Sequence, residues 1–268
     1  MNSEIPTDDT TRRRESMKKG IYILPNLFTT GSLFAGFYGI VAGVNGNYRT
    51  AAIWILVSAL FDGLDGKVAR ATGTMSKFGV EYDSLADLVA FGVAPGLLMY
   101  LWALRPFGRL GWLAAFLFVV CAALRLARFN VQVETVESKR FIGLPSPAAA
   151  SMVSITILFF YHMGWDSSYR KLAILILIYC LAFLMVSNVK YYSFKDPGII
   201  KRQPFGFLVL AVALLIIIAA EPTVMMFALL GCYIFSGPVT ALISCPRRRR
   251  LGKAIRKRKR RESVGQQE

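Results

Sequence analysis

Long apolar stretches, separated by short polar ones, occupy most of the chain between residues 21 and 244. Each stretch is about 20 residues long, the length that an α-helix needs to cross the hydrocarbon core of a bilayer. The pattern predicts helices over 21–44, 50–71, 80–103, 108–130, 143–163, 170–191, 204–220 and 223–244. Short polar connections such as 45–49 favour antiparallel neighbours. We therefore expect an all-α, polytopic integral membrane bundle of about eight transmembrane helices.

Composition supports this fold class. The chain of 268 residues is 55% hydrophobic and has a mean hydropathy of +0.48, which argues against one or two soluble domains. We expect three parts: a polar cytoplasmic N-terminal tail over 1–20, a transmembrane domain over 21–245 and a polybasic cytoplasmic tail over 246–268.

The basic residues gather on one side of this predicted bundle. If both termini are cytoplasmic, every Lys and Arg falls on the cytoplasmic side except Arg49, Arg105, Arg109, Arg170 and Lys171. This asymmetry favours an even number of helices with both termini in the cytoplasm. The formal net charge of +16 invites a nucleic-acid reading, but the basic run 247–261 directly follows a predicted helix. Such a run is typical of contact with anionic lipids, so we expect the bilayer and anionic lipids, and no nucleic acid, as partners.

Four carboxylates interrupt the second and third apolar segments. Asp62 and Asp65 are three residues apart, and Asp83 and Asp87 are four apart, so each pair shares one helix face. The polar piece 71–78 lets the two helices turn back on each other, which brings both pairs to the cytoplasmic end. Ionised carboxylates at this depth are costly unless they are paired, bind a metal or face water. Their oxygens suit two divalent cations, Mg²⁺ or Mn²⁺. No His or Cys lies among these four carboxylates, which argues against zinc.

The residues around the carboxylates favour a phosphate-bearing substrate. Gly66 removes a side chain directly after Asp65, and Ala69 is small, so a ligand can approach the backbone closely. Arg70 follows at the polar end of the same helix, where its guanidinium group suits a phosphate.

These positions match a known signature without departure: DxxDGxxAR, eight residues, then GxxxDxxxD. The matching residues are Asp62, Asp65, Gly66, Ala69, Arg70, Gly79, Asp83 and Asp87. The chain therefore resembles the CDP-alcohol phosphatidyltransferases. The resemblance implies that all four Asp residues bind two divalent cations, that Asp87 is also the general base, and that the enzyme is a homodimer. It further implies contacts to CDP-diacylglycerol from Asn26, Thr29, Gly66, Arg70, Ser76 and Gly79.

Three further segments resemble the branch of this family that uses serine: RLARFNV (125–131), FIGLPSPAA (141–149) and SNVKYYSFK (187–195). The resemblance implies transfer of a phosphatidyl group from CDP-diacylglycerol to the hydroxyl of L-serine, which gives phosphatidylserine and CMP. It also implies a bacterial or archaeal-type cytoplasmic membrane, with the active site facing the cytoplasm. The serine carboxylate needs a cation, for which Arg128, Arg125 and Lys190 are candidates at cytoplasmic helix ends, although each could equally be a topology anchor. For serine itself we expect contacts from Arg128, Asn130 and Lys190.

Three alternatives remain open on the sequence. A sister enzyme would use glycerol 3-phosphate, inositol phosphate or choline, and Arg128, Lys139, Arg140 and Lys190 are compatible with a phosphorylated acceptor. A cation transporter would also place carboxylates in helices, although its sites typically lie at the midplane on broken helices. A lipid-binding scaffold would use the basic tail but has no need for four aligned Asp residues.

Overall fold

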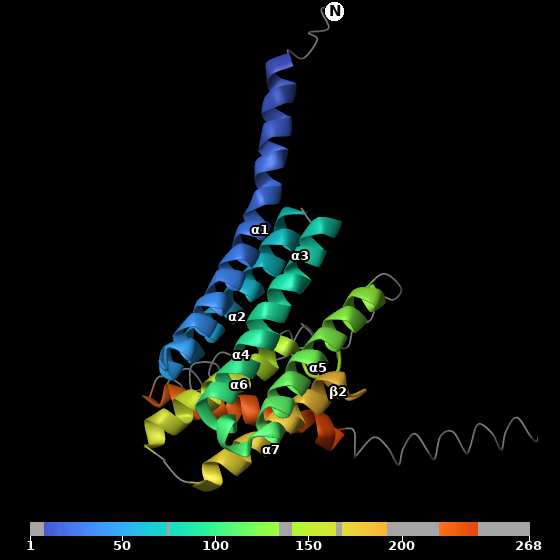
Figure 1. Cartoon of the computed structure of the whole chain (residues 1–268). Coiled ribbons are helices and arrows are strands. Elements are labelled where there is room, and N and C mark those ends of the chain that lie inside the picture. Colours follow the sequence, from blue (N-terminus) through green and yellow to red (C-terminus); the bar gives the residue numbers. More distant parts are fainter. Residues whose placement is uncertain (1–7, 74–75, 134–140, 165–167, 192–219, 241–268) are drawn as a thin grey trace, which may run out of the picture. The chain divides into compact units, whose positions relative to one another are not determined.

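The computed structural model describes residues 8–73, 76–133, 141–164, 168–191 and 220–240. The chain divides into two compact units, Met1–Val136 with Pro145–Val186, and Glu137–Leu144 with Ser187–Glu268. The first unit is helical throughout its described residues (Figure 1). Its elements are α1 (Asp8–Val44), α2 (Tyr48–Thr72), α3 (Lys77–Asp87), η1 (Leu88–Val93), α4 (Ala94–Met99), η2 (Tyr100–Leu104), η3 (Arg105–Phe107), α5 (Arg109–Val133), α6 (Ser146–Met163) and α7 (Ser168–Val186).

Small residues let α1 pack closely against its neighbours. A Cβ atom on Gly36 would lie 2.7 Å from the Cα of Ala90 in η1, so only glycine fits this contact. Against α2, the buried hydroxyls of Ser32 and Ser58 lie 2.8 Å apart and each also bonds to the backbone carbonyl of the other residue. These contacts fix α1 beside α2 and α3, as Figure 1 shows.

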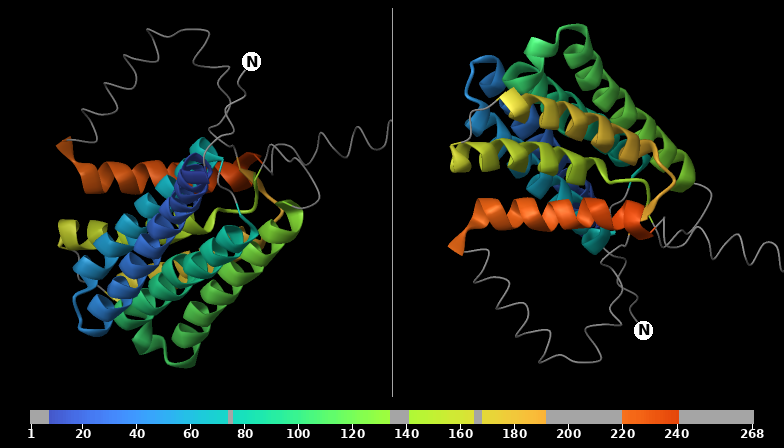
Figure 2. Two further views of the ribbon diagram at one scale, coloured as in Figure 1. Left: turned by 90° about the horizontal axis from the view of Figure 1, so that it is seen from above. Right: turned by 90° about the horizontal axis from the view of Figure 1, so that it is seen from below.

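The third apolar segment forms one long helix with irregular turns. α3, η1, α4, η2 and η3 continue one another from Lys77 to Phe107. The stretch η1 is π-helical and begins directly after Asp87. Insertions of this kind into α-helices occur frequently at functional sites. Gly108 then reverses the chain with a positive φ of 52°, and α5 packs back against this helix and against α7. α6 and α7 run beside each other (Figure 2).

The described residues of the second unit form a short strand pair and one helix. β1 (Phe141–Ile142) pairs antiparallel with β2 (Lys190–Tyr191), and Gly143 N donates to Val189 O at 2.8 Å. Tyr191 is buried and donates its hydroxyl to the carbonyl of Ile234 in the helix Pro222–Thr240 at 3.2 Å. A Cβ atom on Gly237 would lie 2.4 Å from the Tyr191 ring, so a glycine is needed at this contact.

Five described helices are long and apolar enough to cross a membrane: Leu24–Val44, Lys77–Phe107, Arg109–Val131, Ser146–Met163 and Pro222–Thr240. The helix segment Lys171–Val186 is also apolar but is shorter than these five helices. α2 has the length but carries charged residues through much of its second half, including Asp62, Asp65 and Lys67. An all-helical membrane protein is thus confirmed, apart from the two-residue strands. The predicted number of eight spans is not established, because residues 204–219 of the predicted segment 204–220 lie outside the described residues.

Several helices have other bounds than the predicted spanning segments. The predicted span 21–44 agrees with the apolar part Leu24–Val44, but α1 begins at Asp8, because hydropathy registers only the apolar part of a helix that continues into the polar tail. The third segment extends to Lys77–Phe107 instead of 80–103, since Ser76 caps its start. α7 ends at Val186 rather than at residue 191, because the chain there enters β2. The predicted polar connection 71–78 is shorter, between Thr72 and Lys77, where Gly73 ends α2 with a φ of 65°.

Candidate active site

Carboxylates from two helices meet at one end of the first unit. Oxygen atoms of Asp62 on α2 and of Asp83 and Asp87 on α3 all lie within 4.8 Å of one another. Asp65, one turn after Asp62, is close enough to Asp62 and Asp83 for their charges to interact. We call these four residues the carboxylate cluster. The helical spacing within each pair and the short connection between α2 and α3 bring them together, as the sequence predicts.

Two members of the carboxylate cluster, Asp65 and Asp87, are buried, and the other two, Asp62 and Asp83, are half-buried. Asp65 is 5% exposed and Asp87 is 9% exposed. Four negative charges at this depth repel one another, and each loses hydration, so the arrangement requires positive charge nearby. The donors are all carboxylate oxygens, which are the ligands that Mg²⁺ and Mn²⁺ prefer. The residues of the cluster therefore fit a site for divalent cations.

Thr29 on α1 orients one of the carboxylates. Its hydroxyl donates to Oδ2 of Asp65 at 2.9 Å and also lies 3.2 Å from the carbonyl oxygen of Pro25. Thr29 is only 4% exposed, so little water reaches this bond. The hydroxyl of Thr29, a predicted nucleotide contact, thus bonds a carboxylate that is 36 residues away along the chain.

Three other predicted donor contacts meet where α1 approaches the start of α3. A Cβ atom on Gly79 would lie 3.1 Å from Ser76 Oγ and 3.4 Å from Asn26 Oδ1, so these three residues are close together. Ser76 is the N-cap of α3, and its Oγ accepts from the Gly79 backbone N–H at 3.0 Å. This local role explains the serine without a ligand. Thr30 on α1 and Tyr82 on α3 add a further bond, 2.9 Å between their hydroxyl oxygens.

Gly66 and Arg70 form the remaining predicted contact on α2. The Nε of Arg70 donates to the Gly66 carbonyl oxygen at 2.7 Å, which folds the exposed side chain back along the helix. A Cβ atom on Gly66 would meet only the Arg70 Nη2 atom, at 3.7 Å. The missing side chain therefore leaves space beside the guanidinium group.

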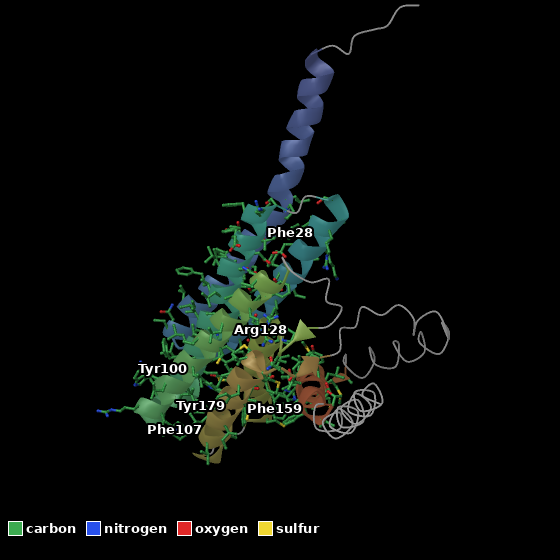
Figure 3. All side chains as sticks on the ribbon, turned by 90° about the vertical axis from the view of Figure 1, so that its right-hand side faces the viewer. Phe28, Tyr100, Phe107, Arg128, Phe159 and Tyr179 are labelled. Atoms are coloured by element: carbon green, nitrogen blue, oxygen red, sulfur yellow. The ribbon has the colours of Figure 1, made fainter. Side chains whose placement is uncertain are left out.

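The structure gives contacts for two of the three predicted serine ligands. Asn130 donates from Nδ2 to Oγ of Ser84 at 3.0 Å. Ser84 is the residue that follows Asp83 in the chain. Arg128, labelled in Figure 3, directs Nη1 at the carbonyl oxygen of Val186 on α7, at 3.5 Å. Lys190 lies in β2 of the second unit, and its side chain is outside the described part of the structure.

Arg125, the third candidate cation, has its own set of contacts. Its guanidinium interacts through charge with Asp62 and Asp87, and its Nη1 donates to Ser146 Oγ at the start of α6. Two arginines three residues apart at one helix end look alike in a sequence, so no local signal distinguishes Arg125 from Arg128.

The geometry and the signature agree with comparisons to known proteins. The chain belongs to the CDP-alcohol phosphatidyltransferase family, whose sequence profile matches residues 22–186. A CDP-diacylglycerol–serine O-phosphatidyltransferase of Helicobacter pylori is 39% identical over 217 residues, which cover 81% of this chain and 90% of the relative. The protein of the same name from Methanocaldococcus jannaschii is 36% identical over 208 residues, covering 77% of this chain and 90% of the relative. An archaetidylserine synthase of Methanothermobacter thermautotrophicus is 38% identical over 177 residues, covering 65% of this chain and 72% of the relative.

Proposed function

We propose that this protein transfers the phosphatidyl group of CDP-diacylglycerol to the hydroxyl of L-serine and releases phosphatidylserine and CMP. The observation that carries the proposal is the carboxylate cluster, in which three carboxylates from α2 and α3 converge within 4.8 Å. Relatives named for this activity match the chain over 90% of their own length, which supports serine as the acceptor.

Two divalent cations, Mg²⁺ or Mn²⁺, would be held by Asp62, Asp65, Asp83 and Asp87. When bound, such cations neutralise charge on the pyrophosphate of the donor and on the departing CMP. Thr29 would hold the Asp65 carboxylate in its ligating orientation, because partners behind a ligand fix its direction.

Asp87 is the proposed general base. The serine hydroxyl gives its proton to this carboxylate while its oxygen attacks the lipid-side phosphorus. A new phosphorus–oxygen bond forms to serine, and the bond between that phosphorus and the CMP oxygen breaks. Asp87 is only 9% exposed, so solvent water competes poorly for this position. One displacement needs no covalent intermediate on the enzyme.

The donor nucleotide would bind where α1, α2 and α3 meet. Asn26 Oδ1 is positioned beside Gly79, and Gly79 has no side chain to fill the space there. Gly66 leaves room on α2, and Arg70 would turn its guanidinium group from the Gly66 carbonyl to a donor phosphate. Ser76 would act here mainly by capping α3. On the acceptor side, Asn130 bonds Ser84, the residue that follows Asp83, and would contact serine.

We further propose that the site faces the cytoplasm and that the enzyme is a homodimer in the membrane. The distribution of Lys and Arg supports the orientation, and the family resemblance is the basis for the homodimer. The polybasic tail would bind anionic lipids. A single cysteine introduced after residue 246 should react with an impermeant reagent in right-side-out vesicles only after permeabilisation. Light scattering from the detergent-solubilised protein should give the mass of two chains.

The first experiment measures CMP release by the purified protein from CDP-diacylglycerol with Mn²⁺ or Mg²⁺. L-serine, glycerol 3-phosphate, inositol phosphate and choline are compared as acceptors, and a chelator is the control for metal dependence. Serine-dependent release with phosphatidylserine as the product supports the proposal. Release with another acceptor alone would replace serine, and no release with any acceptor would refute the enzymatic proposal.

A further inference from the structure

Arg125 is a cation that the fold places at the carboxylate cluster. Its guanidinium is close enough to Asp62 and Asp87 to interact with both through charge. Its Nη1 donates to Oγ of Ser146, which is fully buried at the first residue of α6. The hydroxyl therefore orients the guanidinium on the side of α5 from which its charge reaches Asp62 and Asp87.

The packing of α5 explains this placement independently of charge. α5 runs antiparallel to the long helix Lys77–Phe107. A Cβ atom on Gly92 would lie 3.3 Å from the Cβ of Ala122, and Asn130 bonds Ser84 at 3.0 Å. Along the long helix the two contacts are separated by the same number of residues, from Ser84 to Gly92, as along α5, from Ala122 to Asn130. The two helices therefore keep one register between these contacts. Arg125 lies between Ala122 and Asn130, and this register places it level with the residues next to Asp87.

An anionic group of the substrate beside Arg125 would be favourable during the proposed reaction. Divalent cations bound by the carboxylates would neutralise them, and the guanidinium would then lie beside positive charge. L-serine supplies an anion at this location, because its carboxylate is only a few bonds from the hydroxyl that gives its proton to Asp87. A guanidinium can bind a carboxylate with two parallel hydrogen bonds.

We propose that Arg125 binds the carboxylate of L-serine and thereby selects serine over acceptors without that charge. This inference rests on the proposed function. Arg128 is less suited to the role, because it lies further round α5 with Nη1 directed at the Val186 carbonyl on α7. Ser146 is a positioning residue that fixes the direction of the Arg125 side chain.

The test compares full-length wild-type protein with Arg125→Gln, Arg125→Lys and Arg109→Gln in detergent with CDP-diacylglycerol and Mn²⁺. Arg109 is the matched control, since it is an exposed arginine at the opposite end of α5. CMP release is measured against L-serine, against L-serinamide, which lacks the carboxylate charge, and against CDP-diacylglycerol. Removing a hydrogen-bonded charge typically changes binding by about 10- to 100-fold.

We expect Arg125→Gln to raise the KM for serine by about 10- to 100-fold, with the KM for CDP-diacylglycerol and the use of serinamide unchanged. Arg125→Lys should recover part of the loss, and Arg109→Gln should match wild type. An unchanged serine KM in Arg125→Gln, or an equal loss with serinamide, would overturn the inference.

Thermal unfolding supplies a second readout that does not depend on turnover. Serine should raise the unfolding midpoint of the wild-type protein and not that of Arg125→Gln. If Arg125→Gln does not fold, Arg125→Lys is tested in its place. It should have a higher KM for serine than the wild-type protein and a smaller serine-induced shift in the unfolding midpoint. A wild-type protein without serine-dependent CMP release would refute the proposed function itself. If the wild-type protein releases CMP in a serine-dependent way but the Arg125 variants bind serine normally, only the inference about Arg125 is refuted.

Discussion

Replacing Thr29 with Val tests whether this residue serves the metal site or the nucleotide. Valine keeps the shape of threonine but removes the hydroxyl that donates to Asp65 Oδ2 at 2.9 Å. Both residues are at least 95% buried, so water cannot easily replace the bond. A hydrogen bond to a charged group contributes about 1.5–3 kcal/mol. Since about 1.4 kcal/mol is tenfold in affinity, the Mn²⁺ concentration for half-maximal activity should rise by about 10- to 100-fold.

The assay titrates Mn²⁺ into CMP-release reactions at saturating serine, first at fixed and then at varied CDP-diacylglycerol. We expect near-normal activity at high Mn²⁺, with an unchanged KM for CDP-diacylglycerol. Thr30→Val is the matched control, because its exposed neighbouring hydroxyl bonds Tyr82 and the Asn26 carbonyl rather than a carboxylate of the cluster. A raised KM for CDP-diacylglycerol with normal Mn²⁺ dependence would refute this reasoning and return Thr29 to the nucleotide.

Three other predictions follow from the fold and the cluster. Asp83→Asn should abolish metal-dependent CMP release while the protein still inserts into membranes, and near-normal activity would contradict its role as a ligand. Gly36→Val should lower stability by about 1–3 kcal/mol by overpacking against Ala90, whereas Gly43→Ala, whose added Cβ would be 3.5 Å from its nearest neighbour, should have little effect on the thermal midpoint in detergent. Truncation after Pro246 should leave substantial activity in detergent but weaken binding to anionic vesicles; complete loss of activity in a folded protein would refute the anchoring role.

Much of the fold and the cluster could be predicted from residue order. Apolar stretches of membrane-spanning length fix helices by the cost of unpaired backbone groups in lipid. The spacings of Asp62 with Asp65 and of Asp83 with Asp87 follow from the helical period, so each pair shares a face wherever the helices lie. A short connection between α2 and α3 then leaves few ways to keep the two pairs apart. Helix ends were less predictable, because the Ser76 cap and the β1–β2 pair depend on local bonds that hydropathy does not register.

Only the tertiary structure could distinguish residues that look alike in the sequence. Arg125 and Arg128 are equivalent as basic residues at one helix end, yet the register of α5 against the long helix directs the first to the carboxylate cluster and the second to α7. Thr29 was assigned by resemblance to the nucleotide, whereas packing of α1 on α2 gives its hydroxyl to Asp65. The sequence by itself determined which chemical groups are present and which share a helix face. The partner of each group depends on how separate helices pack, and close contacts such as Gly36 with Ala90 set that packing.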